Sequence, residues 1–335
     1  MKFIRAFAFI AASFTAAVTV GAQPVGVQQL QNSQAQQLQM PQPELRAGTN
    51  APELYLGENE DIGPQRILKI NGQKSFNSIR RQWFDITLDS QAFYSDNANF
   101  ADGTNKIGSF VFVNTAQAAF APTPFDLGAG KFAPAAGFIS QWYNYSSGQM
   151  KPLDFDAQTA FVNLRYFIGN WQFAVGANYT RLLSQPDYEE TYREWLPSVS
   201  AQRIFPISEK VALVVGDVID YHFSHVQSVF GSLDDVNDHL DEMIFLTLNW
   251  QVTPHFAVQP FYRFQYALYN SDAAATGANR NDILNTAGLT MIYSFNQYVS
   301  LRAFFSYNTK WSDDQFTSHY DEFNAGLGAA LDVRF

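Results

Sequence analysis

Apolar and polar residues alternate along the chain from about residue 81 to the C-terminus, most clearly in the last segment. Side chains of an extended strand point to opposite faces in turn, so every second residue shares a face. One face of this segment is apolar and consists of Phe323, Ala325, Leu327, Ala329, Leu331, Val333 and Phe335. The other face is small or polar and consists of Asn324, Gly326, Gly328, Asp332 and Arg334. This pattern predicts a strand between hydrocarbon and a polar interior.

The same alternation recurs in twelve segments, which predicts an all-β fold. The segments are residues 82–94, 107–118, 135–146, 157–168, 171–182, 193–205, 211–225, 241–251, 256–268, 283–295, 299–308 and 323–335. Short connections alternate with long polar ones, as in a transmembrane antiparallel up-and-down β-barrel. The connection at 119–134 breaks this rule because it is long where a short turn is expected. The predicted barrel therefore has about 12 strands, with 10 and 14 left open.

Aromatic residues lie near both ends of the predicted strands, as expected for girdles at the two membrane interfaces. Near the short turns they are Trp171, Trp250, Phe256, Phe295, Tyr298 and Phe335. Near the long loops they are Tyr94, Trp142, Tyr143, Tyr145, Tyr179, Tyr266 and Tyr307. Aromatics make up 16% of the residues, yet the mean hydropathy is only −0.17. Apolar side chains are thus abundant but spread out, which fits strands with one lipid face rather than apolar helices.

The first 80 residues have a different composition and are predicted to lie outside the barrel. Residues 1–22 combine basic Lys2 and Arg5 with an apolar run and the small residues Val20 and Ala22, which predicts a signal peptide. Residues 23–80 are rich in Gln and Pro and poor in large apolar side chains. We interpret them as a flexible periplasmic segment. A self-associating helix in the Gln-rich part and a partial plug from residues 53–70 remain alternatives.

The end of the chain resembles a known signature. A final alternating strand with Phe as the last residue, Leu331-Asp332-Val333-Arg334-Phe335, resembles the C-terminal motif of bacterial outer-membrane β-barrel proteins. The likeness in patterning covers residues 81–335. It implies an outer-membrane location, lipid as the surroundings, and Phe335 as an assembly signal recognised by the barrel-assembly machinery. It identifies an architecture and no particular member, so a porin-like role is an expectation only.

Charge and cysteine content narrow the classes of function. The formal net charge is −10, and loss of the predicted signal peptide makes it more negative. Nucleic-acid binding needs a clustered basic surface, so that class is disfavoured. The chain has no cysteine, so an exported protein of this size must be stabilised without disulfides. A closed, hydrogen-bonded barrel in lipid meets that requirement.

Charged residues on the predicted inner face are the candidate functional residues. The expected lumen-lining residues are Asp85, Asp89, Arg165, Asp220, His222, Arg263, Arg302, Asp332 and Arg334. Charges of both signs either select solutes or pair across a filled interior. Our leading hypothesis is a passive channel for small solutes. A structural or adhesive barrel with binding loops is a further hypothesis.

A catalytic hypothesis rests on Tyr221-His222-Phe223-Ser224-His225. His222 and Ser224 lie two residues apart on one strand face, similar to the His-x-Ser of outer-membrane phospholipase A. That resemblance implies a membrane-embedded hydrolase. The sequence departs from the family because Phe223 replaces an Asp and because alternation points both residues inward, whereas the family's pair faces lipid. We therefore predict a polar lumen cluster rather than a nucleophile and base.

No cofactor or metal site is predicted from sequence. The acidic loop runs are Asp234-Asp235 with Asp238 and Asp241-Glu242, and Asp313-Asp314. Their oxygens could bind a divalent cation, but they match no EF-hand spacing, so we interpret these loops as solvated. Neither a phosphate-binding glycine loop nor zinc-ligand spacing is found.

Overall fold

The computed structural model describes residues 83–334, apart from 186, 229–230, 235–237, 273–278, 297 and 314–318. The predicted signal peptide, the Gln- and Pro-rich segment and Phe335 lie outside the described residues. Twelve long strands form the body. They are β1 (Phe84–Ser95), β2 (Ser109–Phe120), β4 (Gly130–Tyr145), β5 (Phe155–Ile168), β6 (Trp171–Ser184), β7 (Glu190–Ser208), β8 (Val211–Ser228), β10 (His239–Thr253), β11 (Phe256–Asp272), β12 (Asn279–Ser294), β13 (Val299–Ser312) and β14 (Tyr320–Arg334).

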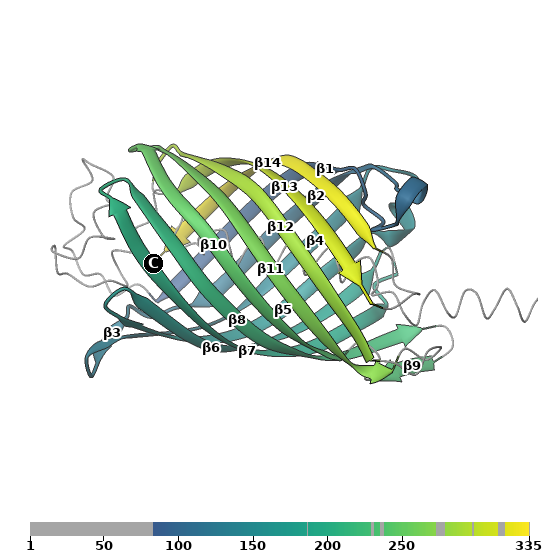
Figure 1. Cartoon of the computed structure of the whole chain (residues 1–335), viewed down its shortest axis with the longest axis horizontal. Coiled ribbons are helices and arrows are strands. Elements are labelled where there is room, and N and C mark those ends of the chain that lie inside the picture. Colours follow the sequence, from purple (N-terminus) through teal and green to yellow (C-terminus); the bar gives the residue numbers. More distant parts are fainter. Residues whose placement is uncertain are drawn as a thin grey trace, which may run out of the picture.

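These strands close into one antiparallel barrel (Figure 1). Each pairs with its neighbour along the chain, β8 pairs with β10, and the first strand pairs with the last through Asp85 opposite Arg334. Closure leaves no long sheet edge, so backbone hydrogen bonds are satisfied within the wall. The predicted all-β fold with twelve barrel strands is confirmed. Among the described residues, no helix is long and apolar enough to cross a membrane.

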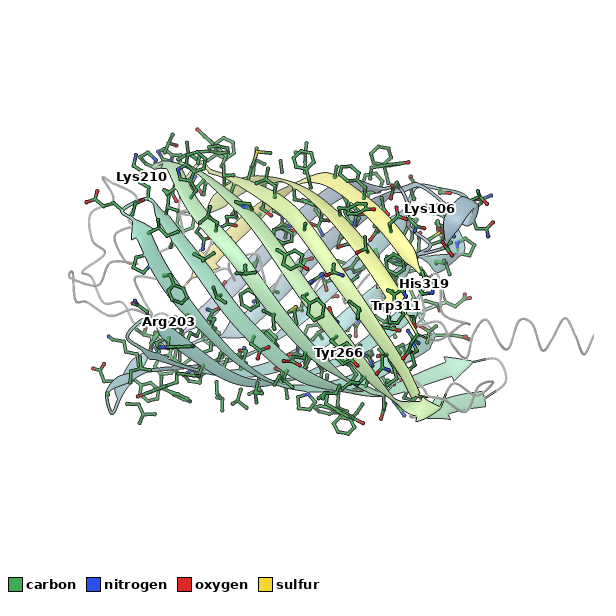
Figure 2. The ribbon with its side chains drawn as sticks, viewed as in Figure 1. Lys106, Arg203, Lys210, Tyr266, Trp311 and His319 are labelled. Carbon is green, nitrogen blue, oxygen red and sulfur yellow. The ribbon has the colours of Figure 1, made fainter. Side chains whose placement is uncertain are left out.

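The two ends of the barrel differ in their connections. Short turns join β5 to β6, β7 to β8, β10 to β11 and β12 to β13 at one end. Longer connections lie at the other end, where η1 (Gly103–Asn105) and η2 (Lys151–Leu153) are found. Figure 2 shows Arg203 and Lys210 at the short-turn end, and Lys106 and His319 at the long-loop end. We call these the inner and outer ends.

The connection at 119–134 contains a hairpin rather than another pair of barrel strands. Strand β3 (Phe125–Leu127) pairs with the start of β4, with Phe125 opposite Phe132 and Leu127 opposite Gly130. Pairing of β3 with any other strand is not seen among the described residues. The hairpin extends from the inner end (Figure 1), so its length does not alter the strand count. A second short strand, β9 (Gly231–Asp234), pairs antiparallel with the last residues of β8 at the outer end.

Alternation places apolar side chains on the outside of the wall. In β1, Phe84, Ile86 and Leu88 are exposed, whereas Asp85, Thr87 and Asp89 are buried. Predicted girdle residues such as Trp171, Trp250, Tyr94 and Tyr307 are also exposed. An apolar outer surface around a closed barrel is suited to lipid and unsuited to water.

Two residues that were predicted to belong to an aromatic girdle point into the barrel instead. Tyr143 and Tyr145 are only 0% and 1% exposed and belong to a buried cluster inside the barrel. The girdle assignment was wrong for both because Trp142-Tyr143-Asn144-Tyr145 places aromatics on both faces of β4. Register decides between the faces: Trp142 and Asn144 share the outer face with Asn114 and Phe112 of β2.

Phenylalanine rings cover glycines on the inner face of the wall. A Cβ atom at Gly216 would collide with the ring of Phe245 on β10, and one at Gly326 would collide with the Cβ of Phe93 on β1 and with the ring of Phe304 on β13. Gly137 and Gly288 meet Phe161 and Phe261 in the same way. Each glycine therefore gives an aromatic ring room to lie against the strand backbone.

Candidate functional site: the barrel lumen

The predicted lumen residues lie on the inner face wherever their side chains are described. Eight of the nine are buried or nearly so and alternate with exposed apolar neighbours: Asp85, Asp89, Arg165, Asp220, His222, Arg263, Arg302 and Asp332. The side chain of Arg334 lies outside the described residues. The eight do not form one cluster, because they are distributed from the inner end to the outer half.

Toward the inner end, a polar seam joins the first strand to the last two. Arg302 on β13 donates hydrogen bonds to Asp89 and to Oε1 of Gln91, the latter at 3.2 Å. Thr87 donates to Oδ1 of Asp332 at 2.7 Å. The contact between Arg302 and Asp89 pairs opposite charges. Together, these contacts connect β1 to β13 and β14, where the barrel closes.

Arg263 is a buried cation on the inner face of β11. Its side chain is 1% exposed, and Nη2 donates to Oγ1 of Thr286 at 3.0 Å. Its Nε and Nη1 make no hydrogen bond with the described residues. A buried guanidinium with unused donors is costly, which makes Arg263 a point in the lumen suited to an anionic or carbonyl oxygen.

In the outer half, three strands bring together an acid–histidine cluster that we define as Glu194, Asp220, His222, His239 and Asp241. Nδ1 of His222 lies 2.9 Å from Oε2 of Glu194. Nε2 of His222 lies 3.2 Å from Oδ1 of Asp220 and 3.4 Å from Oδ2 of Asp241. Nε2 of His239 lies 3.6 Å from Oδ1 of Asp241. Carboxylates of β7, β8 and β10 thus surround two imidazoles.

Neighbouring side chains hold this cluster in place. The Tyr192 hydroxyl donates to Oε2 of Glu194 at 2.7 Å, and Gln265 donates to Oδ2 of Asp241. The His239 ring stacks between His222 and Tyr269, with ring centroids 3.9 and 4.4 Å away. The geometry of the imidazoles is therefore set by four strands, β7, β8, β10 and β11, and not by β8 alone.

Two further ionic groups lie in the outer half. Asp282 accepts from Arg280 and lies 2.8 Å from Nζ of Lys310. Glu322 accepts from Ser95 at 2.8 Å and from Asn308 at 2.9 Å. All of these side chains are buried, so the outer half of the lumen carries a dense set of ionisable groups.

The opposite side of the outer half carries a buried apolar cluster. This cluster, which we call the aromatic wall, spans β1, β2, β4, β5, β6, β7 and β13. Its members are Phe93, Ala98, Val111, Val113, Tyr143, Tyr145, Met150, Phe155, Ala157, Leu182, Tyr192 and Phe304. Buried polar side chains, among them Gln141, Thr159 and Thr180, lie on the same strands. The inner face is mixed here, because alternation reveals two faces but does not require the inner one to be polar throughout.

The structure does not assemble a nucleophile and base from His222 and Ser224. Both face inward and are buried, as alternation predicts. The Ser224 hydroxyl donates to Oδ1 of Asp238 at 3.0 Å, while both ring nitrogens of His222 face carboxylates. A general base needs a nitrogen within reach of the hydroxyl, and His222 has none directed at Ser224.

Sequence reasoning missed Glu194, His239 and Asp241. Glu194 alternates with the exposed Trp195, so its inward direction was detectable from the pattern. Asp241 was interpreted as part of an acidic loop, but β10 begins at His239 and places both residues on the inner face. Their meeting with His222 depends on the pairing of β8 with β10, which places His239 opposite His222.

Comparisons with known proteins agree with a barrel. No protein-family profile matches the sequence, and no curated protein matches it in sequence. The chain is similar in structure to the COG4313 outer membrane channel from Pseudomonas putida F1, with 11% identity, a TM-score of 0.49, and coverage of 75% of this chain and 96% of the other. It is also similar to the translocator domain of the autotransporter NalP from Neisseria meningitidis, with 14% identity, a TM-score of 0.38, and coverage of 74% and 88%.

The NanC porin is a third similar structure, with 9% identity, a TM-score of 0.42, and coverage of 73% of this chain and 98% of the other. These neighbours are outer-membrane β-barrels of differing activities, so the likeness concerns the barrel fold alone. The closed wall, its apolar exterior and its asymmetric ends are those of a transmembrane β-barrel of the outer-membrane type.

Proposed function

We propose that the protein is a narrow, porin-like channel that conducts small solutes across the outer membrane. The observation that carries this proposal is the series of ionisable side chains along the inner face. It runs from Asp332 and Asp85, through Asp89, Arg302 and Arg263, to the acid–histidine cluster. Buried charges are expensive in a membrane protein and commonly mark the route of an ion or polar solute.

The arrangement of charge suggests how solutes are selected. Arg302 forms an ion pair with Asp89 toward the inner end, while several carboxylates lie close together in the outer half. A twelve-stranded barrel is intermediate between filled eight-stranded barrels and wide pores, so side chains strongly limit its width. We expect small currents and a preference for one sign of charge rather than the conductance of a wide pore.

Recordings from planar bilayers containing the full mature chain test this proposal. We expect discrete current steps and a reversal potential in a salt gradient that shifts when Arg302→Gln removes a lumen cation. The matched control is Arg203→Gln, because Arg203 lies over the outward-facing ring of Trp171. Folded protein that inserts but gives no steps under any voltage would overturn the proposal.

A second candidate is a structural barrel whose long loops bind an external partner. The packing of the aromatic wall supports it, because Tyr143, Val111 and Val113 are fully buried in the outer half. Such a barrel needs no pathway. Silent bilayers combined with loop-dependent binding to whole cells would favour this candidate over the channel.

A further inference from the structure

We propose that His222, His239, Asp241 and Asp220 form a binding site for a transition-metal dication of the zinc class, in the outer half of the lumen. The candidate ligand atoms of His222, His239 and Asp241 all lie within 4.8 Å of one another, and all three residues are buried. Asp220 supplies a fourth oxygen beside Nε2 of His222. Imidazole nitrogens together with carboxylate oxygens are the donor set that zinc and similar ions prefer.

The spacing of the donor atoms fits a metal better than it fits hydrogen bonds. The three contacts between an imidazole Nε2 and a carboxylate oxygen measure 3.2, 3.4 and 3.6 Å. Strong hydrogen bonds to carboxylates are about 2.7–2.9 Å long. Around a tetrahedral zinc ion with bonds of about 2.0–2.1 Å, neighbouring ligand atoms lie about 3.3 Å apart. The observed nitrogen–oxygen distances therefore match those between the ligand atoms of one zinc ion.

An unused acceptor points into the same space. Oδ1 of Asp241 accepts no hydrogen bond from the described residues, although the side chain is only 4% exposed. Oδ1 of Asp220, 3.2 Å from Nε2 of His222, also accepts no hydrogen bond from the described residues, and its side chain is 15% exposed. Buried carboxylate oxygens without a donor are costly, and a cation relieves that cost.

The charge of the cluster is compatible with a dication. Glu194, Asp220 and Asp241 bring three carboxylates to one imidazole, His222, within a buried site. Two protonated imidazoles and a dication bound to neutral imidazoles each leave one net negative charge on these five residues. The dication also makes use of the nitrogen lone pairs.

Glu194 occupies the position of a supporting residue. Its Oε2 lies 2.9 Å from Nδ1 of His222, which leaves Nε2 directed at Asp220 and Asp241. Metal-binding histidines are commonly oriented in this way by a carboxylate on the other ring nitrogen. Tyr192 in turn holds Glu194 through its hydroxyl, so the support continues into the aromatic wall.

Binding requires one local movement. The rings of His222 and His239 are nearly parallel, with an interplanar angle of 7°, so their lone pairs run side by side instead of meeting at one point. Rotation of His239 about its Cβ–Cγ bond, out of the stack with Tyr269, directs its Nε2 toward the shared ion. Sequence spacing does not reveal the site, because the two histidines lie on paired strands, opposite each other.

Metal titration of the full mature chain tests the proposal. The protein is purified without a polyhistidine tag, folded in detergent, stripped with chelator and titrated with Zn²⁺ in a calorimeter. We expect one ion per chain. Co²⁺ in place of Zn²⁺ is expected to give the visible absorption of a tetrahedral site.

Variants locate the site. His239→Gln and Asp241→Asn are each expected to weaken Zn²⁺ binding more than about 100-fold, and Glu194→Gln by about 10- to 100-fold as a supporting residue. His255→Gln is the matched control, because His255 lies in the short turn before β11 and contacts the carbonyl of Ser294. It is expected to bind like the original protein. A difference in electrophoretic mobility between heated and unheated samples verifies that each variant is folded.

Two results would overturn the metal site. One is the absence of Zn²⁺ binding to the folded, chelator-stripped protein at micromolar concentrations. The other is binding that is unchanged in both folded variants, His239→Gln and Asp241→Asn. Neither result depends on conductance, so a silent bilayer leaves the metal test intact.

Discussion

The outer half of the lumen has two walls that are stabilised by different physical means. On one side, rings and methyl groups pack as the aromatic wall, mostly from β1, β2, β4, β5 and β6, with Tyr192 of β7 and Phe304 of β13. On the other, β7, β8, β10, β12 and β13 supply the acid–histidine cluster and the Asp282 ion pairs. Apolar packing is non-directional and tolerates swaps of similar volume, whereas buried ion pairs depend on every partner. The two walls should therefore respond differently to the same kind of truncation.

The largest expected effect comes from the polar wall. Lys310→Met leaves Asp282 with only part of its compensating charge, and both side chains are buried. Removal of one partner from a buried ion pair costs about 3–5 kcal/mol. Urea unfolding of the vesicle-inserted barrel, followed by tryptophan fluorescence, measures the loss. Lys210→Met is the control, because Lys210 lies in the exposed turn between β7 and β8. Equal stability of the two variants would contradict the dependence on pairing.

Truncation of the aromatic wall is expected to have a smaller, graded effect. Leu182 is 2% exposed, so Leu182→Ala should lower the unfolding free energy by about 2–5 kcal/mol through lost contacts and a cavity. Leu182→Met conserves volume and should cost less than about 1.5 kcal/mol. The same unfolding assay distinguishes them. If Leu182→Met lowers the unfolding free energy as much as Leu182→Ala does, the aromatic wall depends on the shape of the side chain and not only on its apolar volume.

Tyr192 joins the two walls, and its hydroxyl tests their coupling. Tyr192→Phe keeps the ring in the aromatic wall but removes the hydrogen bond to Glu194. A hydrogen bond to a charged group contributes about 1.5–3 kcal/mol, so we expect a loss near the lower end of that range. Tyr94→Phe should change little, because its ring is exposed beside Phe110. If Tyr192→Phe leaves the unfolding free energy unchanged, the two walls are independent.

The smallest expected effect is at the outer rim, where water reaches an ion pair. Nζ of Lys106 lies 2.7 Å from Oδ2 of Asp321, and this hydrogen bond raises the pKa of Lys106 above its ordinary value of 10.5. A raised pKa stabilises the fold below the ordinary value, and this stabilisation disappears as pH rises through the raised value. Because the pair is exposed, Lys106→Gln should cost less than about 1 kcal/mol at neutral pH and nothing at very alkaline pH. Unfolding at both pH values and at high salt checks this.

The sequence pattern predicted which residues face outward better than it predicted which residues meet inside the barrel. In β14, alternation identified the outward Leu327 and the inward Asn324 without reference to other strands, because lipid and lumen differ in polarity. The inward side of β4 was harder, since Tyr143 and Trp142 are both aromatic. Asp220 and His222 were predicted to face the lumen, but their meeting with His239 and Asp241 was not predictable, because it depends on which strands pair and at which register.

The glycines beneath the phenylalanine rings determine how far those rings reach into the barrel. At Gly216 the ring of Phe245 lies in the place that a side chain on β8 would fill. An added methyl group there would push the ring away from the wall and toward the central axis. The position of each ring therefore depends on a missing side chain, and a single carbon atom on a strand backbone is enough to shift it.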